Sequence, residues 1–499
     1  MTEATESADV VVVGGGGSGL ASAVSAAQRG VSVLLVEKQA KVGGTTQLSV
    51  GSLTASGTRH QRRAGIHDSA EEFERDMAAF DPALLTGDAP ALRRVLATES
   101  AATLEWLEAL GVAFVGPYLE PPHRTPRMHN VIPASRSYVS RLHEAARRLG
   151  VSILEGTAVV ELLLEDGSVT GVRVQDPDTG RQREIRARRG VILAAGDFSG
   201  NPDMRRQFLP EAAAAALPIN ETANGDGHRL GISAGGVGRR MEVTFGPQLR
   251  FPPAPKPGII DRLPDWKLLC RAQAALIQRL PTSALKPFVK SLLITHMSPT
   301  SAMFEAGAVL VNETGSRFCD ERSSVAALSS QPRAKGFIVF DEAIAKKFDT
   351  PPHSISTAPG IAFAYFSDYR RGRPDLMFKA ASSTEMAQKL AVDPAALAES
   401  VDGAGLGRPL HAMGPVFSML TVTEGGLDVD DCLRVLSASG EPIPGLWAVG
   451  GVGQGGMLLK GHGHHIAWAM TSGRLAGAAA ARRLEAGSPT ATTAATRTA

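Results

Sequence analysis

The first part of the chain places one alanine-rich segment between two apolar runs. Residues 9–13 and 31–36 are rich in valine and leucine, as in strands that are buried on both faces. Residues 20–29 are rich in alanine and typical of a helix, which Gly30 ends. The pattern therefore predicts one β-α-β unit at the start of the chain.

Helix and strand patterns continue to about residue 245. Helical patterns cover residues 69–110 and 137–149. Alternating apolar and polar residues at 151–174 predict antiparallel strands, and a further strand is predicted at 191–195. This half of the chain is therefore expected to mix helices with buried strands.

The middle of the chain has a different character. Residues 247–264 are rich in proline, and mixed helix and strand patterns follow up to about residue 407. The buried-strand pattern then returns at 446–449, and a last alanine-rich helix is predicted over about 465–486. The final residues 488–499 are mostly threonine and alanine and are predicted to be disordered.

A glycine motif links the first predicted strand to the first helix. It reads Gly14-x-Gly16-x-x-Gly19, and Glu37 ends the second strand. In this motif the first glycine makes a tight turn, the second lets backbone approach a pyrophosphate, and the third allows close helix packing. The helix N-terminus attracts the phosphates, and the acid can accept ribose hydroxyls. A purely structural turn explains neither the spacing nor Glu37, so we predict a dinucleotide site.

Later segments favour FAD among the dinucleotides. Lys38 and the loop Gly43-Gly44-Thr45-Thr46 follow the second strand, where the pyrophosphate and isoalloxazine of FAD would extend. Residues 191–197 lead a strand into a glycine turn, and residues 445–456 read GLWAVGGVGQGG. Glycine-rich turns at both ends of the chain are therefore expected to meet on one FAD molecule.

These segments resemble the flavoprotein family of soluble fumarate reductases and 3-ketosteroid dehydrogenases. The resemblance covers almost the whole chain. Its motifs are GGTTQLSVGS at 43–52, NGDGHRLGISAGG at 224–236, VNETGSRFCDE at 311–321, TEGGLDVD at 423–430 and GLWAVGG at 445–451. Together they are specific for the family and less so for any one activity.

The resemblance implies an α/β fold, a dinucleotide-binding (Rossmann-like) FAD domain with an inserted α+β capping domain. Residues 1–245 and 408–487 are expected to form the FAD domain and 246–407 the cap, with the substrate at their junction against the flavin. The changes in composition at both boundaries agree independently. In some relatives a histidine after the second strand holds FAD covalently. Thr45 and Thr46 stand there, so non-covalent FAD is expected.

The predicted FAD contacts come from these motifs and the strands beside them. They are Gly14, Gly16, Gly17, Ser18, Gly19, Glu37, Lys38, Gly43, Gly44, Thr45, Thr46, Ser49, Gly51, Ala158, Val159, Ala195, Gly196, Asn224, Asp226, Gly450, Gly451, His465 and Ile466. Asp226 precedes a predicted helix, so it is as plausible as an N-terminal cap as it is as a flavin contact.

The segment at 459–473, LKGHGHHIAWAMTSG, resembles the part of ketosteroid dehydrogenases that holds the substrate carbonyl. In those enzymes a tyrosine and, four residues later, a glycine N–H bind the keto oxygen. Here Gly463 matches the glycine, and Leu459 replaces the tyrosine. No nearby carboxylate or cysteine completes a metal site, so no metal is predicted. Four basic residues could supply replacement donors, or could pack against FAD: Lys460, His462, His464 and His465.

A second family position is also changed. Eight positions after the arginine of an Arg-Phe pair, the family places its proton-transferring residue, an arginine in fumarate reductases and a tyrosine in ketosteroid dehydrogenases. Counting from Arg317 leads to Val325, which cannot transfer protons. Arg322 could bind an anion, although an exposed surface role is equally plausible. Other candidates for proton transfer, each more often a packing residue, are His296, Tyr118 and Tyr138.

The composition of the chain limits the kinds of partner and cofactor that are expected. The chain has 52 basic and 50 acidic residues, without the basic excess typical of nucleic-acid binding. Its three cysteines include no C-x-x-C pair, which argues against iron–sulfur or zinc sites and favours a reducing cytoplasm. The N-terminus lacks a signal-peptide pattern. No stretch offers the roughly 20 apolar residues that an integral membrane segment needs, so none is predicted. A cytoplasmic protein with a small-molecule substrate and a separate electron acceptor is expected.

Three functions are consistent with these patterns. The favoured hypothesis is an FAD-dependent dehydrogenase that desaturates a ketone or other carbonyl compound by hydride transfer to flavin N5. An alternative is the reduction of an unsaturated carboxylic acid, as in fumarate reductases, with basic side chains binding the carboxylates. A third is a non-catalytic flavoprotein that carries electrons.

Overall fold

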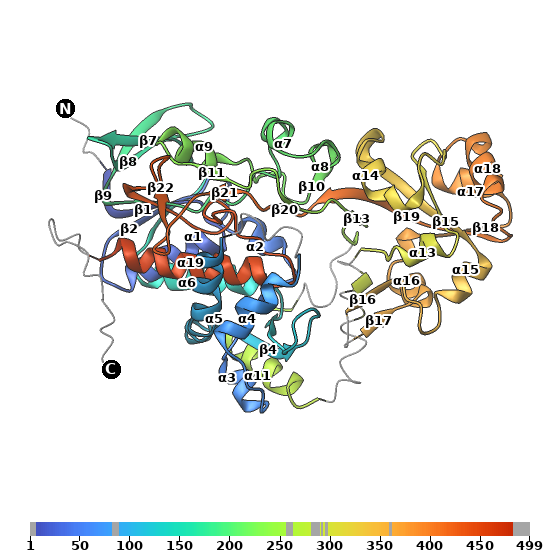
Figure 1. Cartoon of the computed structure of the whole chain (residues 1–499), viewed down its shortest axis with the longest axis horizontal. Helices are drawn as coiled ribbons and strands as arrows, with labels where there is room; N and C mark the ends of the chain where they lie inside the picture. Colours follow the sequence, from blue (N-terminus) through green and yellow to red (C-terminus); the bar gives the residue numbers. More distant parts are fainter. Residues whose placement is uncertain are drawn as a thin grey trace, which may run out of the picture.

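The computed structural model describes residues 6–81, 89–255, 263–280, 290, 293–294, 298–358 and 362–482. The predicted tail at 488–499 and the candidate His296 lie outside these residues. Figure 1 shows a larger body that contains both ends of the described chain and a smaller body at the opposite end of the long axis.

The larger body begins with the predicted β-α-β unit. It consists of β1 (Glu6–Val13), α1 (Gly17–Ala27) and β2 (Val33–Val36). β1 pairs in parallel with β2 on one side and with β9 (Gln182–Leu193) on the other. All four residues of β2 are buried, as the continuous apolar run predicts.

The main sheet joins strands from both ends of the chain. Its order is β22 (Arg434–Leu436), β23 (Pro442–Ala448), β9, β1, β2 and β6 (Ser152–Leu154). Only the β22–β23 pair along this path is antiparallel. The predicted antiparallel strands are β7 (Ala158–Glu165) and β8 (Ser168–Gln175), which attach to β9. β6 was expected to be antiparallel and is instead parallel to β2, because it extends the sheet edge beside it.

Helices from the two ends of the chain pack against each other beside this sheet. α19 (His464–Ala480) lies along α1 (Figure 1), where a Cβ added at Gly473 would lie 2.3 Å from the Ser18 carbonyl oxygen. A Cβ at Gly477 would lie 2.2 Å from the Ser22 carbonyl oxygen. Glycine therefore allows this close approach of the two helices. α5 (Pro90–Leu110) packs on α19, and α6 (Arg136–Arg148) packs on α1.

The smaller body is built on a second sheet. Its order is β10 (Leu217–Pro218), β19 (Leu410–Leu420), β15 (Lys335–Asp341) and β14 (Val309–Asn312), with β13 (Gln248–Arg250) and β18 (Met377–Ala380) also paired to β19. A separate apolar core lies between this sheet and its helices. The helices are α13 (Ala302–Glu305), α14 (Ser324–Ser329), α15 (Glu342–Lys347), α16 (Phe366–Gly372), α17 (Ser383–Leu390) and α18 (Pro394–Gly403).

Two segments refine the predicted boundaries of the cap. β19 starts at Leu410, beyond the predicted boundary, and pairs only with strands of the second sheet among those described. α11 (Lys267–Ile277) falls within the predicted cap but packs on β4 (Ala113–Tyr118) of the larger body. We therefore propose that the cap extends through Leu420 and that residues 263–280 belong with the FAD domain.

The remaining elements are short. They are α2 (Gly44–Leu48), β3 (Ser52–Thr54), α3 (Arg59–Arg63), α4 (Ala70–Ala78), β5 (Met128–Ile132), α7 (Pro202–Phe208), α8 (Glu211–Ala215), α9 (Asp226–Ser233), β11 (Gly238–Arg239), β12 (Thr244–Phe245), β16 (Ser356–Ala358), β17 (Ala362–Ala364), β20 (Val422–Thr423) and β21 (Gly426–Leu427). Short 3₁₀ turns cover Glu321–Ser323, Pro332–Ala334 and Pro374–Leu376. No helix in the described ranges is both long and apolar enough to cross a bilayer.

Candidate active site

A cavity of about 870 Å³ opens between the carboxyl ends of β1 and β2 and the cap. Its volume lies toward the upper end of the roughly 300–1,000 Å³ that is usual for ligand sites. Every predicted FAD contact lines it except Gly19 and Asn224. Gly19 packs against the backbone of Gly14, and the carbonyl of Asn224 accepts a hydrogen bond from Asn201. Motifs far apart in the sequence therefore meet around one space.

Only the second position of the glycine motif faces open space. Gly14 has a positive φ of 108°, which makes the turn after β1. A Cβ added at Gly16 would meet nothing within 4 Å, whereas one at Gly19 would lie 1.8 Å from the Gly14 carbonyl oxygen. The cavity thus reaches the backbone of Gly16, where a pyrophosphate must approach, directly before the N-terminus of α1.

Glu37 is held in position at the end of β2. Its carboxylate accepts the backbone N–H of Gly15 at 2.6 Å and that of Gln39 at 2.8 Å. A carboxylate has about four acceptor sites, so two bonds leave capacity for ribose hydroxyls. Beside it, Lys38 pairs with Asp226 at 2.7 Å, and Asp226 begins α9. The donors and acceptors at this end of the cavity fit the nucleotide half of FAD.

The ends of β9 and β23 continue the same edge of the sheet beyond β1. Gly196 and Gly450 line the cavity, and the N–H of Gly450 donates to the Ser472 hydroxyl of α19 at 3.0 Å. Asp197 was not among the predicted contacts, although it ends the predicted glycine turn. Burial raises the pKa of Asp197 to about 6, while its carboxylate accepts the N–H of Thr423 at 2.7 Å. This carboxylate therefore ties the sheet to the strands that lead into the cap.

Comparison with known proteins decides the family. A model of the FAD binding domain family matches residues 9–459. The chain belongs to this family. FAD is its cofactor, and Gly16, the start of α1 and Glu37 are the groups that would hold the pyrophosphate and ribose.

Curated relatives of this family member include reductases and dehydrogenases. Fumarate reductase (cytochrome) of Shewanella frigidimarina is 26% identical over 492 residues, covering 96% of this chain and 77% of the relative. The 4-oxocyclohex-2-ene-1-carboxylate 5-dehydrogenase of Sinomonas cyclohexanicum is 24% identical over 608 residues, covering 96% and 94%. The chain is thus an FAD-dependent oxidoreductase of the class that acts on CH–CH bonds.

A solved structure of the same fold comes from Sterolibacterium denitrificans. Its 3-ketosteroid delta1-dehydrogenase superposes with a TM-score of 0.65 at 20% sequence identity, covering 96% of this chain and all of that one. This similarity concerns the fold. It agrees with the two bodies of Figure 1, an FAD domain and a cap.

The cap side of the cavity is mainly polar. Beyond the FAD contacts, the described lining includes Phe245, Gln248, Arg250, Ser298, Thr300, Ser356 and Thr357. Arg250 is the one arginine among the described lining residues, and its guanidinium donates to the Gln248 side chain at 3.1 Å. None of these residues was predicted. Neither the proline-rich segment that holds Gln248 and Arg250 nor the later segments that hold the serines and threonines carry a recognised motif.

The two changed family positions lie outside the cavity lining. Val325 belongs to α14 and packs partly buried on the cap core, and its carbonyl accepts the Ser418 hydroxyl at 3.0 Å. Leu459 is fully buried in the core of the larger body. Both positions have therefore become packing positions.

The predicted catalytic candidates fall into two groups. His462 and Gly463 line the cavity. Lys460 lies just outside the lining, where its ammonium donates to the Thr244 carbonyl at 2.8 Å. Arg322 does not reach the cavity, because its side chain is 88% exposed and pairs with Asp320. The position of Arg322 therefore does not support the predicted role in binding an anionic substrate.

The two predicted tyrosines are also absent from the described cavity lining. Tyr138 is fully buried in α6, and its hydroxyl donates to the Gly51 carbonyl at 2.9 Å. Burial raises its pKa well above the usual range. Tyr118 ends β4 and packs partly buried beside Cys270 of α11 in a small cluster. A packing role accounts for both side chains.

The histidines at the start of α19 differ in their partners. His465 lines the cavity and pairs with the fully buried Glu424 at 3.0 Å. Burial acts to raise the pKa of Glu424, but His465 and Lys460 outweigh it and keep the pKa low. His462 pairs with Glu120, from a loop 342 residues earlier in the chain. Neither glutamate was predicted as a site residue.

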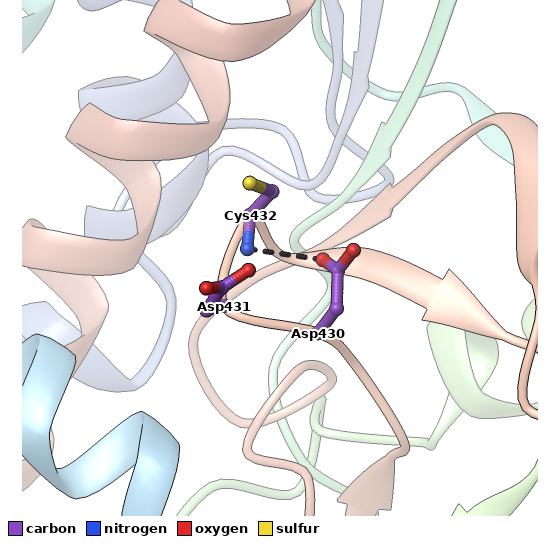
Figure 2. A group of neighbouring side chains, drawn as sticks. All are labelled: Asp430, Asp431 and Cys432. Atoms are coloured by element: carbon purple, nitrogen blue, oxygen red, sulfur yellow. Dashed lines mark hydrogen bonds between the residues drawn. The ribbon is translucent and has the colours of Figure 1, made fainter. Parts of the chain in front are cut away.

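One group in the described chain resembles a metal site by its residue types. Figure 2 shows Asp430, Asp431 and Cys432 on the turn between β21 and β22. Asp430 accepts the backbone N–H of Cys432 at 3.0 Å and pairs with Arg434. These contacts and the exposed position account for the group as a turn.

Proposed function

We propose that this flavoenzyme desaturates a ketone or related carbonyl compound at the bond next to the carbonyl carbon. The observation that carries the proposal is Gly463, which lines the cavity at the N-terminus of α19. Its backbone N–H donates to no acceptor in the part of the chain described. A carbonyl oxygen placed there would receive a hydrogen bond and the partial positive charge of the helix end.

The arrangement favours enolate formation. Removing the α-proton of a ketone places negative charge on the carbonyl oxygen, and a donor fixed in advance stabilises that charge. Bound FAD would accept the β-hydrogen as hydride. A Cβ at Gly463 would lie 2.8 Å from the Thr54 hydroxyl oxygen, and φ is 84°, so this position requires glycine. Thr54 donates to the carbonyls of His462 at 2.7 Å and of Gly463 at 3.3 Å, and these bonds hold the backbone in place. The chain thus presents one rigid donor to the substrate end of the cavity.

Anaerobic mixing tests this proposal. The holoenzyme is mixed with 4-androstene-3,17-dione, 4-oxocyclohex-2-ene-1-carboxylate and cyclohexanone, and flavin absorbance near 450 nm is followed. At least one ketone is expected to bleach the flavin and to yield a product with one more C=C bond. If no carbonyl compound in such a panel bleaches the flavin, desaturation is refuted.

A second candidate is the reduction of an unsaturated carboxylic acid. Arg250 supports it, because a guanidinium in the cavity can bind a carboxylate. A dicarboxylate such as fumarate has two carboxylates, however, and Arg250 is the one arginine among the described lining residues. Rapid oxidation of dithionite-reduced enzyme by fumarate, faster than by any enone, would place this reaction first.

We also propose that the electrons leave through a separate acceptor. The three cysteines are Cys270, Cys319 and Cys432, and all three thiols are unpaired and distant in sequence. They provide no ligand set for an iron–sulfur cluster. Turnover with a ketone is therefore expected to need an added dye or quinone, and steady-state rates with and without it measure this requirement.

A further inference from the structure

His462 and Glu120 form a closely bound pair at the edge of the cavity. The Glu120 carboxylate accepts a hydrogen bond from Nδ1 of the imidazole. It also accepts the backbone N–H of His462, at 3.0 Å to Oε1 and 3.1 Å to Oε2. Contacts to both ring and backbone fix the orientation of the imidazole and place its hydrogen on Nδ1. The lone pair of the neutral ring is then on Nε2.

The other edge of the imidazole is accessible. The His462 side chain is 48% exposed and lines the cavity, whereas that of Glu120 is 9% exposed. Nε2 has no hydrogen-bond partner among the described residues. The carboxylate is thus buried, and the unpartnered Nε2 belongs to a half-exposed side chain of the cavity lining.

A neighbouring histidine shows a purely structural arrangement. Both ring nitrogens of His464 are engaged, Nδ1 by the Lys460 carbonyl and Nε2 by Nε2 of His123 at 2.9 Å. Burial lowers the pKa of His464 to about 4. For His462, the hydrogen bond that the ring donates to the Glu120 carboxylate outweighs burial and raises the pKa. The two histidines therefore differ in burial, in hydrogen bonding and in the direction of the pKa shift.

The loop that carries Glu120 is anchored by buried charges. Arg127 is fully buried and pairs with Asp68 and Asp76, each at 2.6 Å. Within the loop, the N–H of His123 donates to the Glu120 carbonyl at 3.0 Å. The Glu120 carboxylate is therefore attached to a rigid support and keeps the imidazole ring in place.

We propose that His462 is the proton-transferring residue of this enzyme and that Glu120 is its positioning residue. This inference rests on the proposed function for its direction. It assigns the task that Val325 cannot perform to a different segment, directly beside Gly463. The substrate class is then a carbonyl compound whose α-carbon reaches Nε2 while its oxygen faces the Gly463 N–H.

In the direction of desaturation, the neutral imidazole of His462 acts as the base. The Nε2 lone pair forms an N–H bond with the α-proton, and the electrons of the broken C–H bond become the enolate π-bond. The enolate collapses to the enone as the β-hydrogen leaves with its electron pair toward the flavin. The substrate loses one proton and one hydride. The imidazolium is stabilised by Glu120 until its proton passes to solvent.

The direction of pH dependence follows from the charged groups around the ring. Glu120 raises the pKa of His462, and Arg250 from β13 opposes it. On its own segment, His464 interacts electrostatically with His462, while Lys460 donates to the Thr244 carbonyl and His465 pairs with Glu424. Because the base must be neutral, the rate of flavin reduction should rise with pH through the raised pKa. Glu120→Gln should move that rise to lower pH.

Two variants and two matched controls test the pair in the holoenzyme. His462→Gln should slow flavin reduction by the reactive ketone about 100- to 10,000-fold and remove the pH-dependent rise. Glu120→Gln should keep a slower, shifted profile. His67→Gln and Glu399→Gln make the same changes at exposed positions outside the cavity lining and should retain the wild-type profile. FAD content and thermal midpoint are measured for all variants.

A second readout does not depend on a substrate. In holoenzyme labelled with ¹³C at histidine Cε1, the NMR signal absent from His462→Gln should titrate above pH 6.5 and move to lower pH in Glu120→Gln. An unshifted signal, or flavin reduction in His462→Gln within threefold of wild type, would overturn the proposal.

The two proposals can fail separately. If ketones do not react but fumarate oxidises the reduced enzyme, desaturation fails, and His462→Gln is then tested as the proton donor in that direction. If neither class reacts, an unshifted NMR titration still refutes the pair. A shifted titration supports it.

Discussion

The substitution Gly16→Ala is expected to weaken FAD binding without destabilising the fold. Gly16 has φ −73° and ψ −174°, which alanine adopts without strain, and its added Cβ would meet no protein atom within 4 Å. The apoprotein is therefore expected to keep its unfolding free energy within about 1 kcal/mol of wild type. The new methyl instead occupies the space where the pyrophosphate of FAD would approach the backbone.

The expected loss of FAD affinity follows from packing. An extra methyl forced into a closely packed contact costs about 1–3 kcal/mol, which corresponds to about a 5- to 150-fold rise in Kd. Titration of the apoprotein with FAD, followed by flavin fluorescence, measures the Kd. Urea unfolding of the apoprotein measures its stability.

Two other glycines serve as comparisons. Gly403 ends α18 in the cap, and its added Cβ would likewise meet nothing within 4 Å, so Gly403→Ala should leave the Kd unchanged. Gly19→Ala places a Cβ 1.8 Å from a backbone oxygen and should destabilise the apoprotein itself. Wild-type FAD affinity in Gly16→Ala would show that the pyrophosphate does not lie over this residue, which would refute the assignment of the motif.

Two further predictions concern the charges and histidines beneath the site. Arg127→Leu leaves the buried carboxylates of Asp68 and Asp76 without their shared partner and should lower the unfolding free energy by about 3–5 kcal/mol; a change below about 1 kcal/mol in urea unfolding would contradict this. His464 has its pKa lowered from 6.5 to about 4, so between these pH values the unfolded chain binds more protons, and stability falls as pH falls. His464→Gln should reduce this slope, and an unchanged slope across a pH series of unfolding curves would disprove it.

Sequence patterns predict the parts of the site that depend on local spacing. The turn at Gly14, the open position at Gly16 and the acid at Glu37 lie within one β-α-β unit, so the strand runs and glycine spacing are sufficient. The pairing of β19 with the cap sheet cannot be predicted in this way. The sequence of an apolar strand has the same pattern whichever sheet the strand joins. The predicted boundary at residue 408 rests on the family resemblance and on the change in composition, and neither specifies which sheet β19 joins.

The missed residues of the site share a physical cause. Glu120 meets His462 across 342 residues, and nothing in the sequence around Glu120 marks a buried carboxylate. Glu424 lies inside a recognised family motif, but its burial follows from packing against His465 and Gln454. Arg250 reaches the cavity from a short strand within a proline-rich segment. In all three cases the charged side chain reaches the site through the tertiary fold, which no periodic pattern in the sequence indicates.

The contact between α1 and α19 also sets an order of events during synthesis. The Ser25 hydroxyl of α1 donates to the Arg474 carbonyl of α19 across 449 residues. At about 5–20 residues per second, a ribosome needs roughly 20–90 s to make the intervening chain. For that time the face of α1 that α19 covers stays open to chaperones. A message truncated before α19 would yield the glycine motif without its covering helix, and flavin could be captured only after translation is nearly complete.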